Sequence, residues 1–360
     1  MAHLLSVGSM HGRRYEIVKY LDEGGMQEVY VARDTVLERE VALKVPKSQS
    51  ASRRFHRSAV TAARVNHPNV ARTLDYFDEG GMFYLIEELI VGKDLQQIRA
   101  LIPAFDPDLC AMVFHHFAKG LAASHHEGVV HRDLKPSNIM VVGGTGFSGL
   151  KVTDFGIAKM AEAEFGDVDP DNETTITGSQ TVFGALPYLS PEMINAPKEV
   201  GTASDVWSMG AIVYTLMSGE HPFGRGLGAV NRIINDPLPT IPKLANKAQF
   251  KPLVEVLFPV VLSCFERDPA NRPTADNVVS ELDAICYADS DRSVGIVENY
   301  IGQKAFGFIT ARSGKSFFHR DSVYGVLPKT GGKVLFTSFA GSPHPRAHPV
   351  LAVKKKTKTK

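Results

Sequence analysis

Three kinds of feature are scarce in this 360-residue chain, and each scarcity argues against a class of protein. The three cysteines, Cys110, Cys264 and Cys286, are far apart and lack C-x-x-C spacing, which favours buried thiols in a reducing compartment over a disulfide framework or zinc site. The longest apolar run, 254–265, contains Pro259 and is shorter than the ~20 residues of a membrane-spanning helix. The N-terminus lacks the basic start and apolar core of a secretory signal. We therefore expect a soluble cytoplasmic protein with no membrane partner.

Acidic residues are scarce at the C-terminal end, although the net charge of the whole chain is only +1. Residues 294–360 carry twelve Lys and Arg but two Asp and Glu, a formal charge of +10, whereas the rest of the chain carries −9. This asymmetry predicts two bodies with different partners, the basic one being a candidate for binding a polyanion. A solvated basic tail is the alternative, because five of the twelve cations lie in residues 354–360.

Apolar periodicity divides the chain into a strand-rich part, a helical part and a second strand-rich part. Alternation predicts strands at 15–21, 29–33, 40–45, 71–77 and 82–89, with a helix at 53–65. Helical spacing predicts longer helices at 108–127, 206–218, 253–266 and 274–287. Residues 288–293 are polar and are predicted to be a linker, beyond which short alternating runs with glycines predict an all-β domain. The expected fold class is α+β, followed by a small all-β domain.

Two short motifs in the helical part contain the residue types that phosphoryl transfer requires. They are His131-Arg-Asp-Leu-Lys-Pro-Ser-Asn138 and Thr153-Asp-Phe-Gly156. Moving a phosphoryl group from a nucleotide requires cations on the phosphates, oxygen ligands for magnesium and a carboxylate that orients the attacking hydroxyl. Asp133 suits the last of these roles. Asn138 and Asp154 suit the magnesium, and Lys44 suits the phosphates.

These motifs occur in the order and spacing found in protein kinases, and residues 14–287 resemble the bacterial relatives of eukaryotic serine/threonine kinases. The resemblance implies a bilobal kinase fold, with a small lobe at 14–90 and a large lobe at 91–287 after an N-terminal extension at 1–13. It implies ATP and Mg²⁺ as cofactors and protein serine and threonine hydroxyls as acceptors. Lys135 is then expected to contact both the γ-phosphate and the acceptor.

The same resemblance implies the remaining parts of a nucleotide site and of an activation segment. The positions expected to bind ATP are Leu21, Gly24, Gly25, Val29, Ala42, Lys44, Glu87, Leu89 and Met140. The backbone of Glu87 and Leu89 is expected to supply hinge hydrogen bonds, with Ile86 behind the adenine. Arg272 is expected to pair with Glu192, and Thr177 and Thr181 to be phosphorylated by the kinase itself. The alternative is that these two threonines belong to a solvated loop and reflect only its polar composition.

Three family positions are altered, and they leave the activity open. Asp22 and Gln27 replace two glycines of the phosphate-binding loop, and Ala185 replaces a threonine that orients the catalytic aspartate and lysine. The helix glutamate that pairs with the catalytic lysine in the family falls on Ser58 here. The first reading is a working kinase; the alternative is a catalytically weak or inactive relative that acts as a nucleotide-sensing scaffold.

The loss of that glutamate predicts a different partner for Lys44. No Asp or Glu occurs in residues 41–74, so a shifted register does not recover the carboxylate. Asp154 and the nucleotide phosphates are the candidate partners, with Glu28 a weaker one. If the missing carboxylate is a real deficit, Ser58→Glu is expected to raise the activity.

Aromatic residues alternate with glycines and cations in the C-terminal region. Lys304-Ala-Phe-Gly-Phe-Ile309 and Lys315-Ser-Phe-Phe-His-Arg320 resemble the two nucleic-acid motifs of cold-shock domains, which are five-stranded OB-type barrels. The resemblance implies such a domain at 294–353, before a basic tail at 354–360. It implies binding of single-stranded RNA or DNA by Tyr300, Lys304, Phe306, Phe308, Phe318 and His319. Asn299 stands where the family has tryptophan. The alternative is a barrel whose aromatic residues form its core and which docks proteins.

Overall fold

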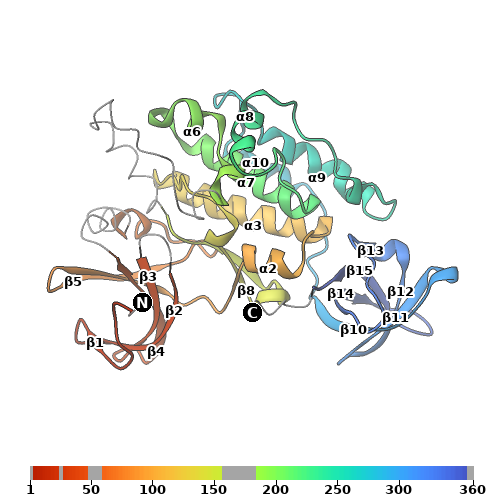
Figure 1. Ribbon diagram of the computed structural model, residues 1–360, viewed down its shortest axis with the longest axis horizontal. Helices are drawn as coiled ribbons and strands as arrows, with labels where there is room; N and C mark the ends of the chain where they lie inside the picture. The colour runs from red at the N-terminus through yellow and green to blue at the C-terminus, as the bar shows by residue number, and fades with distance from the viewer. Residues whose placement is uncertain (1–2, 24–26, 48–58, 156–183, 355–360) are drawn as a thin grey trace.

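The computed structural model describes residues 3–23, 27–47, 59–155 and 184–354, and three bodies follow one another along it (Figure 1). A twisted sheet comes first, a group of helices second, and a small β-barrel third. Within these described residues, no helix is both long enough and apolar enough to cross a membrane. The arrangement agrees with the α+β class and the two-lobed kinase-like fold expected from the sequence.

A six-stranded antiparallel sheet forms the small lobe, with strand order β1-β2-β3-β4-β6-β5. Its strands are β1 (Met10–His11), β2 (Tyr15–Glu23), β3 (Gln27–Asp34), β4 (Arg39–Pro46), β5 (Thr73–Glu79) and β6 (Met82–Glu88). Side chains alternate along β4, so Val41, Leu43 and Val45 enter the core of this lobe. Ala42 and Lys44 therefore point to the other face of the sheet, which is the face that the functional site uses.

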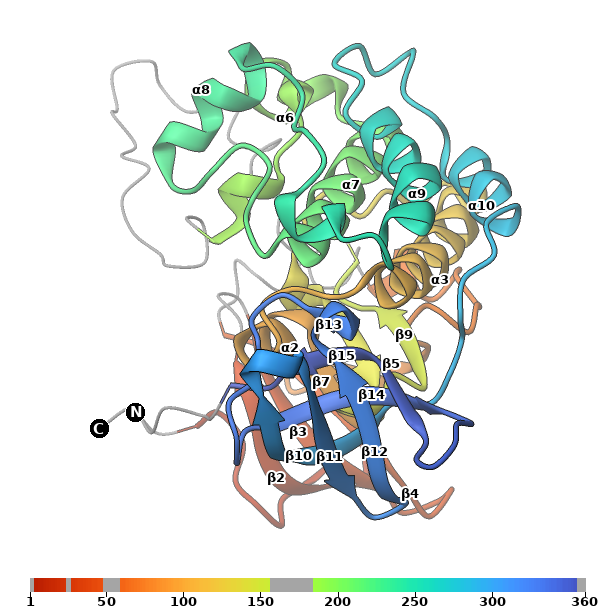
Figure 2. The same cartoon turned by 90° about the vertical axis from the view of Figure 1, so that its right-hand side faces the viewer.

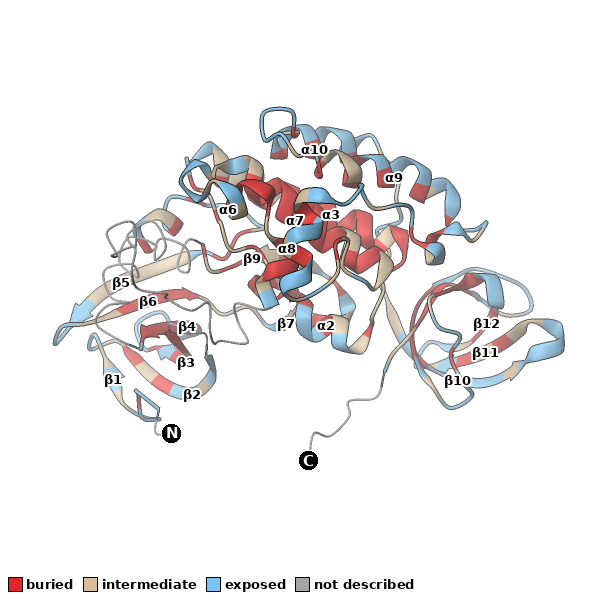
Figure 3. Cartoon of the chain, turned by 45° about the horizontal axis from the view of Figure 1, so that its top comes forward, coloured by how far each residue is buried: buried red, intermediate tan, exposed pale blue. Residues whose placement is uncertain are grey.

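The large lobe is built around two helices that are buried on nearly every side, α3 (Pro107–His126) and α7 (Thr202–Ser218). Figure 3 shows both of them in the interior, whereas α9 (Lys251–Ser263) and α10 (Ala275–Asp283) are buried on one side only. The close approach of α7 to α9 needs a glycine, because a Cβ added at Gly210 would lie 2.5 Å from Cys264 Cβ. The four long helices predicted from the sequence are confirmed, although α10 ends four residues earlier than predicted.

Short elements connect these helices and carry the catalytic motifs. They are β7 (Gly92–Asp94), α2 (Leu95–Leu101), η1 (Pro136–Asn138), β8 (Ile139–Val142), η2 (Gly144–Gly146), β9 (Gly149–Val152), η4 (Leu186–Tyr188), α6 (Pro191–Asn195), η5 (Pro197–Glu199), α8 (Leu227–Asn235) and η6 (Lys243–Asn246). β7, β8 and β9 form a three-stranded sheet. The Ala71 amide donates to the Val152 carbonyl at 2.8 Å, which ties the segment before β5 to the strand that precedes Asp154.

The C-terminal body is a closed five-stranded barrel. Its strands are β10 (Ser293–Ile301), β11 (Phe306–Ala311), β12 (Gly314–His319), β14 (Lys333–Phe339) and β15 (Arg346–Ala352); the short β13 (Val323–Tyr324) pairs with β15, and two turns, η7 (Gly302–Lys304) and η8 (Arg320–Ser322), lie between strands. The sheet order is β12-β11-β10-β14-β15-β13, and a pairing of β12 with β15 at Phe317 and Arg346 closes it. The predicted all-β domain is therefore present.

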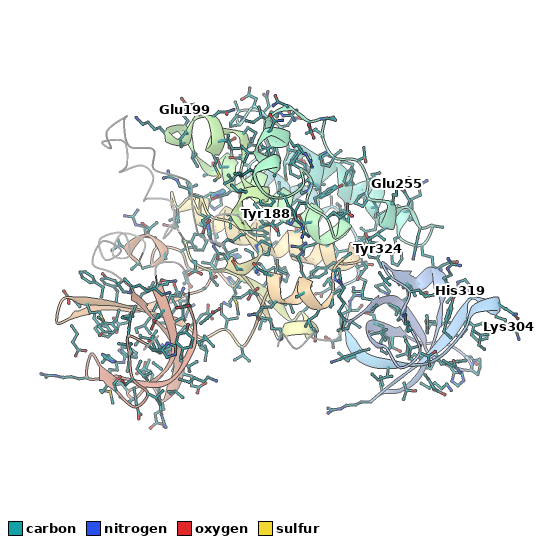
Figure 4. All side chains as sticks on the ribbon, viewed as in Figure 1. Tyr188, Glu199, Glu255, Lys304, His319 and Tyr324 are labelled. Atoms are coloured by element: carbon teal, nitrogen blue, oxygen red, sulfur yellow. The ribbon has the colours of Figure 1, made fainter. Side chains whose placement is uncertain are left out.

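The barrel is packed against the large lobe (Figure 2), and just after β15 the Lys354 amide donates to the Leu101 carbonyl at the end of α2 at 2.8 Å. The Tyr324 hydroxyl donates to the Met217 carbonyl at 2.8 Å, and in Figure 4 Tyr324 lies on the side of the barrel toward the helices while Lys304 lies on the far side. Tyr324, Leu335 and Leu351 belong to the same apolar cluster as the core of the large lobe. The barrel thus shares part of its core with the large lobe.

One side chain of the segment predicted as a linker is buried. Arg292 makes two hydrogen bonds to the carboxylate of Asp106, at 2.9 and 3.0 Å, and both side chains are buried. Asp106 is also the N-cap of α3, because its side chain accepts from the Leu109 amide. A buried ion pair with two hydrogen bonds therefore joins the start of the barrel to the central helix of the large lobe.

Candidate active site

Lys44 bridges two carboxylates on the inner face of the small-lobe sheet. Its Nζ lies 2.5 Å from Oε2 of Glu87 and 2.8 Å from Oδ1 of Asp154. The register of the sheet explains the first contact: β4 and β6 pair antiparallel, with Ala42 opposite Glu87 and Lys44 opposite Leu85, so all four side chains share one face. Asp154 follows β9 with a φ of 60°, a left-handed backbone conformation that turns its side chain toward Lys44.

The electrostatics of this cluster keep the lysine charged. Burial disfavours the ammonium ion, but attraction to Asp154 and Glu87 outweighs burial and raises the pKa of Lys44 above its ordinary value. Burial also raises the pKa of Glu87, and the attraction of Lys44 opposes this rise without cancelling it. For Asp154 the balance is reversed: burial is outweighed by Lys44, and the pKa of this carboxyl is lowered.

Glu87 is a partner of Lys44 that sequence reasoning missed. The sequence placed Ile86 behind the adenine and gave Glu87 a backbone role; in the structure Ile86 packs in the small-lobe core with Leu43, on the other face of the sheet. The residue on Lys44's face is Glu87. An acidic residue within the apolar run of β6, paired in register with β4, was the available signal. The hinge roles of the Glu87 and Leu89 backbone stay predictions.

The other candidate partners of Lys44 behave differently. The predicted pair of Lys44 with Asp154 is present, and Asp154 also accepts a hydrogen bond from Gln27 Nε2 at 3.1 Å. The Glu28 carboxylate instead accepts from the Tyr30 hydroxyl and from the Leu4 amide. Glu28 therefore serves the small lobe's own structure, and its prediction as a weak partner of Lys44 is wrong.

A buried aspartate holds in place the loop of residues 131–138, which contains Asp133. The Asp205 carboxylate, at the start of α7, accepts hydrogen bonds from the backbone amides of His131 and Arg132, each at 2.8 Å. His125 Nε2 lies 3.0 Å from the same carboxylate. The His131 ring in turn contacts the Thr153 carbonyl at 2.9 Å. Because α7 is rigidly packed, these bonds fix the loop before Asp133 and couple it to the segment before Asp154.

Asp133, Lys135 and Asn138 form a second cluster within this loop. Lys135 Nζ donates to Oδ2 of Asp133 at 2.8 Å, and the Asn138 side-chain amide donates to the Asp133 carbonyl, also at 2.8 Å. The Asp133 and Lys135 side chains keep 12% and 17% of their surface exposed, so both are open to a reactant. The Thr153 amide and hydroxyl both donate to the Asn138 carbonyl, which brings Asn138 next to the Asp154 segment.

The residues expected around the adenine come from both lobes. Val29 lies opposite Lys44 in the β3–β4 register, and Ala42 is buried on the same face of β4. Leu21 is 47% exposed near the end of β2, Leu89 is half-buried after β6, and Met140 is half-buried on β8. Their contacts with ATP stay predictions. Four of the predicted functional positions lie outside the described residues: Gly24, Gly25, Thr177 and Thr181.

The predicted pair of Glu192 and Arg272 is confirmed and is almost completely buried. Arg272 donates to both oxygens of Glu192, at 2.7 and 3.2 Å, and its guanidinium lies 5.1 Å from the centre of the Trp207 ring. Ser204 donates to the same carboxylate at 2.6 Å. This network joins α6, which carries Glu192, to α7 and to the loop before α10.

The barrel corrects one predicted nucleic-acid contact. Phe318 is fully buried in the barrel core, so its ring does not reach the surface; it stacks with the half-buried Tyr300 at 6.0 Å. Side chains alternate along β12, and the outward ring is Phe317, which packs beside Phe306 and Phe308. Lys304 is exposed, and His319 lies 3.2 Å from Asp321.

Comparison with known proteins agrees with this geometry. The protein kinase domain family matches residues 15–282. A probable serine/threonine-protein kinase of Clostridium perfringens is 32% identical over 288 residues, which cover 78% of this chain and 39% of that protein. Serine/threonine-protein kinase PrkC of Bacillus subtilis is 29% identical over 290 residues, which cover 79% of this chain and 42% of that protein. This chain thus spans about two fifths of the length of these curated relatives.

Solved structures show the same fold. The crystal structure of Rad53 1–466 in complex with AMP-PNP matches with a TM-score of 0.57 and 23% sequence identity, over 74% of this chain and 64% of that one. The matched family domain covers the sheet, the helices and both clusters around Lys44 and Asp133. On this match and its bacterial serine/threonine kinase relatives, the chain belongs to the protein kinase family.

Proposed function

We propose that this protein is a serine/threonine kinase that transfers the γ-phosphate of ATP to hydroxyl groups of proteins and of itself. The observation that carries the proposal is the pair of bonded clusters, Lys44 with Asp154 and Asp133 with Lys135, joined through the Thr153–Asn138 hydrogen bonds. The catalytically inactive scaffold is the less favoured reading, because the charged residues expected to take part in the transfer lie in these two bonded clusters.

The proposed transfer uses these side chains in distinct roles. Asp133 accepts a hydrogen bond from the acceptor hydroxyl and takes its proton as the oxygen attacks the γ-phosphorus. The bond from that phosphorus to the β–γ bridging oxygen breaks, and ADP leaves. Lys135 and Lys44 supply positive charge to the transferred group and to the other phosphates.

Asn138 and Asp154 would hold Mg²⁺. Amide and carboxylate oxygens are ligands that this ion prefers. Because Thr153 precedes Asp154, its hydrogen bonds to Asn138 bring Asn138 and Asp154 close together. The ion would neutralise charge on the phosphates. This chain's own contribution is the placement of the two oxygen donors by rigid backbone contacts.

Mapping of the acceptor residues tests the proposal. The full chain is incubated with γ-labelled ATP, Mg²⁺ and a general protein substrate, and the products are mapped by mass spectrometry. We expect phosphoserine and phosphothreonine, because Lys135 follows Asp133 by two positions, as in kinases that phosphorylate these residues. Some of the phosphorylated sites are expected between residues 159 and 183. Absence of transfer would favour the nucleotide-sensing scaffold, and phosphotyrosine alone would contradict the proposed acceptor.

We propose single-stranded RNA or DNA binding as a second function, on the aromatic surface of the barrel. Phe306, Phe308 and Phe317 lie with ring centres 5.4 to 6.0 Å apart. Lys315 Nζ lies 4.7 Å from the Phe308 ring centre, and the Arg346 guanidinium lies 4.9 Å from that of Phe317. Half-buried rings beside cations suit stacking on unpaired bases and contact with phosphates. An OB-type identity for the barrel is part of this proposal.

Binding of the full chain to a single-stranded oligonucleotide is expected to weaken as salt rises, because the cations displace counterions. Phe308→Ala removes one stacking surface and is expected to cost about 1 to 3 kcal/mol of binding free energy with little change in the salt slope. Deleting residues 354–360 removes five cations and is expected to flatten that slope. Fluorescence anisotropy at several salt concentrations measures both effects. Binding whose affinity does not change with salt, or no binding, would contradict the nucleic-acid proposal and favour a protein-docking role for the barrel.

A further inference from the structure

Lys44 has an acidic partner that belongs to a strand. In the family to which this chain belongs, the partner of the catalytic lysine is expected from a helix of the small lobe, and the corresponding position here is Ser58, outside the described residues. Glu87 lies on β6, directly hydrogen-bonded in the sheet to β4, which carries Lys44. The ion pair therefore connects two neighbouring strands of one sheet.

The geometry of the pair leaves little freedom to either side chain. The Lys44 and Glu87 side chains are only 6% and 8% exposed, and their charged atoms are 2.5 Å apart. The backbones on both sides are fixed by strand pairing, with Val41 opposite Glu88 and Leu43 opposite Ile86. Strand pairing therefore fixes the backbone positions of both residues, and no helix takes part in this ion pair.

The neighbouring glutamate gives an internal comparison. Glu88 is adjacent in the chain, but side chains alternate along a strand, and its carboxylate pairs with Lys151 of β9 at 2.7 Å. It also accepts a hydrogen bond from the Arg72 amide. Of these two neighbouring glutamates, Glu87 is the one whose side chain shares the sheet face of Lys44.

We propose that Glu87 is the permanent positioning residue for Lys44, replacing the mobile helix carboxylate of the family with one that is fixed in the sheet. This inference rests on the proposed kinase function and concerns its regulation. Asp154 is free to turn from Lys44 toward a metal ion, while Glu87 holds the lysine in line with the phosphates. Alignment of the lysine is then independent of the helix position, so control of this kinase falls on the activation segment or on the acceptor.

The reactivity of the Lys44 amine tests this proposal without any phosphoryl transfer. The full-length wild type, Glu87→Gln and Glu88→Gln are each labelled with a small acylating reagent across a range of pH, and the modification of Lys44 is read by mass spectrometry. The labelling midpoint is the pH at which half of Lys44 is modified. In Glu87→Gln, which removes one of the two carboxylates next to Lys44, this midpoint is expected to fall by about 1 pH unit or more, since an opposite charge at this range raises a lysine pKa. Glu88→Gln, the matched control, is expected to keep the wild-type midpoint.

Kinetics of the same variants separate positioning from folding. Glu87→Gln is expected to lower kcat by about 10- to 100-fold with a small change in KM for ATP, because the lysine is misplaced in the transition state while the adenine site is intact. Glu87→Asp keeps the charge and is expected to recover most of the rate. Ser58→Glu is expected to change kcat by less than about twofold, since Lys44 is already held.

Three results would overturn the proposal. They are an unchanged labelling midpoint in Glu87→Gln, equal loss of rate in Glu87→Asp and Glu87→Gln, or a large gain of rate in Ser58→Glu. If Glu87→Gln does not fold, the rate of Ser58→Glu decides: a change of less than about twofold supports the proposal, and a large gain overturns it. A labelling shift in a protein that transfers no phosphate would support the Glu87 anchor and reject the proposed kinase function, so the two failures are distinguishable.

Discussion

Asp133→Asn is expected to lower the rate of phosphoryl transfer by about 10²- to 10⁴-fold, because it removes the base while keeping the shape of the side chain. The surrounding loop is held by Asp205 and not by the Asp133 carboxylate, so the loop is expected to keep its conformation. Lys135 loses its 2.8 Å partner and stays available to the γ-phosphate. Initial rates of transfer from labelled ATP measure the effect.

The control for this variant is an aspartate of the same lobe that lies far from the chemistry. Asp276 is exposed at the start of α10 and pairs with His126, so Asp276→Asn is expected to keep the wild-type rate. Thermal unfolding of both variants checks that the large lobe is intact. A rate in Asp133→Asn equal to that of the wild type would falsify the assignment of Asp133 as the base.

Arg272→Met is expected to lower the free energy of unfolding of the large lobe by about 3 to 5 kcal/mol, since it leaves the buried Glu192 carboxylate without its countercharge. Arg272 also donates to the carbonyls of Ala203 and Glu266, and these acceptors lose their partner as well. Urea denaturation of wild type and variant measures the difference. Lys251→Ala, which removes an exposed pair with Glu255, is the control and is expected to cost less than about 0.5 kcal/mol.

The same pair predicts a pH dependence. Burial opposes ionisation of Glu192, but hydrogen bonds from Arg272 and Ser204 lower the pKa of this carboxyl below its ordinary value of 4.5. A group with a lowered pKa stabilises the folded state above its unfolded pKa, and this stabilisation is lost as the pH falls below 4.5. The difference between wild type and Arg272→Met is therefore expected to shrink in acid. A constant difference down to acid pH would show that the ion pair is not its source.

The parts of the site that come from contiguous motifs could be predicted from the sequence. Asp133, Lys135 and Asn138 lie within eight residues of one another in a loop, so local chain geometry already brings them together. The pairing of Glu192 with Arg272 was likewise expected, on the family resemblance. The division into strand-rich and helical parts follows from apolar periodicity, which the one-sided burial of α9 and α10 explains for those two helices.

Two of the errors, those at Ile86 and Phe318, have one physical cause, which is the two-residue period of a strand. Ile86 was expected on the nucleotide side and Glu87 is there; Phe318 was expected on the barrel surface and Phe317 is there. A shift of one residue exchanges the two faces of a strand, and a short apolar run does not indicate which face is buried. The register with β4 and with β11 decides the matter, and that register is a long-range property.

The packing of the barrel on the large lobe could not be predicted either. The sequence identifies Tyr324, Leu335 and Leu351 as apolar, but not whether their partners belong to the barrel or to another body. Arg292 lies in a polar stretch that is typical of a linker, and its buried partner Asp106 is 186 residues away in the chain. Such a contact depends on the final arrangement of both bodies and leaves no local pattern.

The proposed transfer requires Lys44, Asp133 and Asp154 to act together. The most direct test is the rate of transfer from γ-labelled ATP by the full-length wild type and by Asp154→Asn, each with Mg²⁺ and with the metal chelated. We expect transfer by the wild type that needs Mg²⁺, and a loss of at least about 10²-fold in Asp154→Asn, since the carboxylate that would hold the ion is gone. Equal labelling of the two proteins, or transfer by the wild type that persists after chelation, would contradict it.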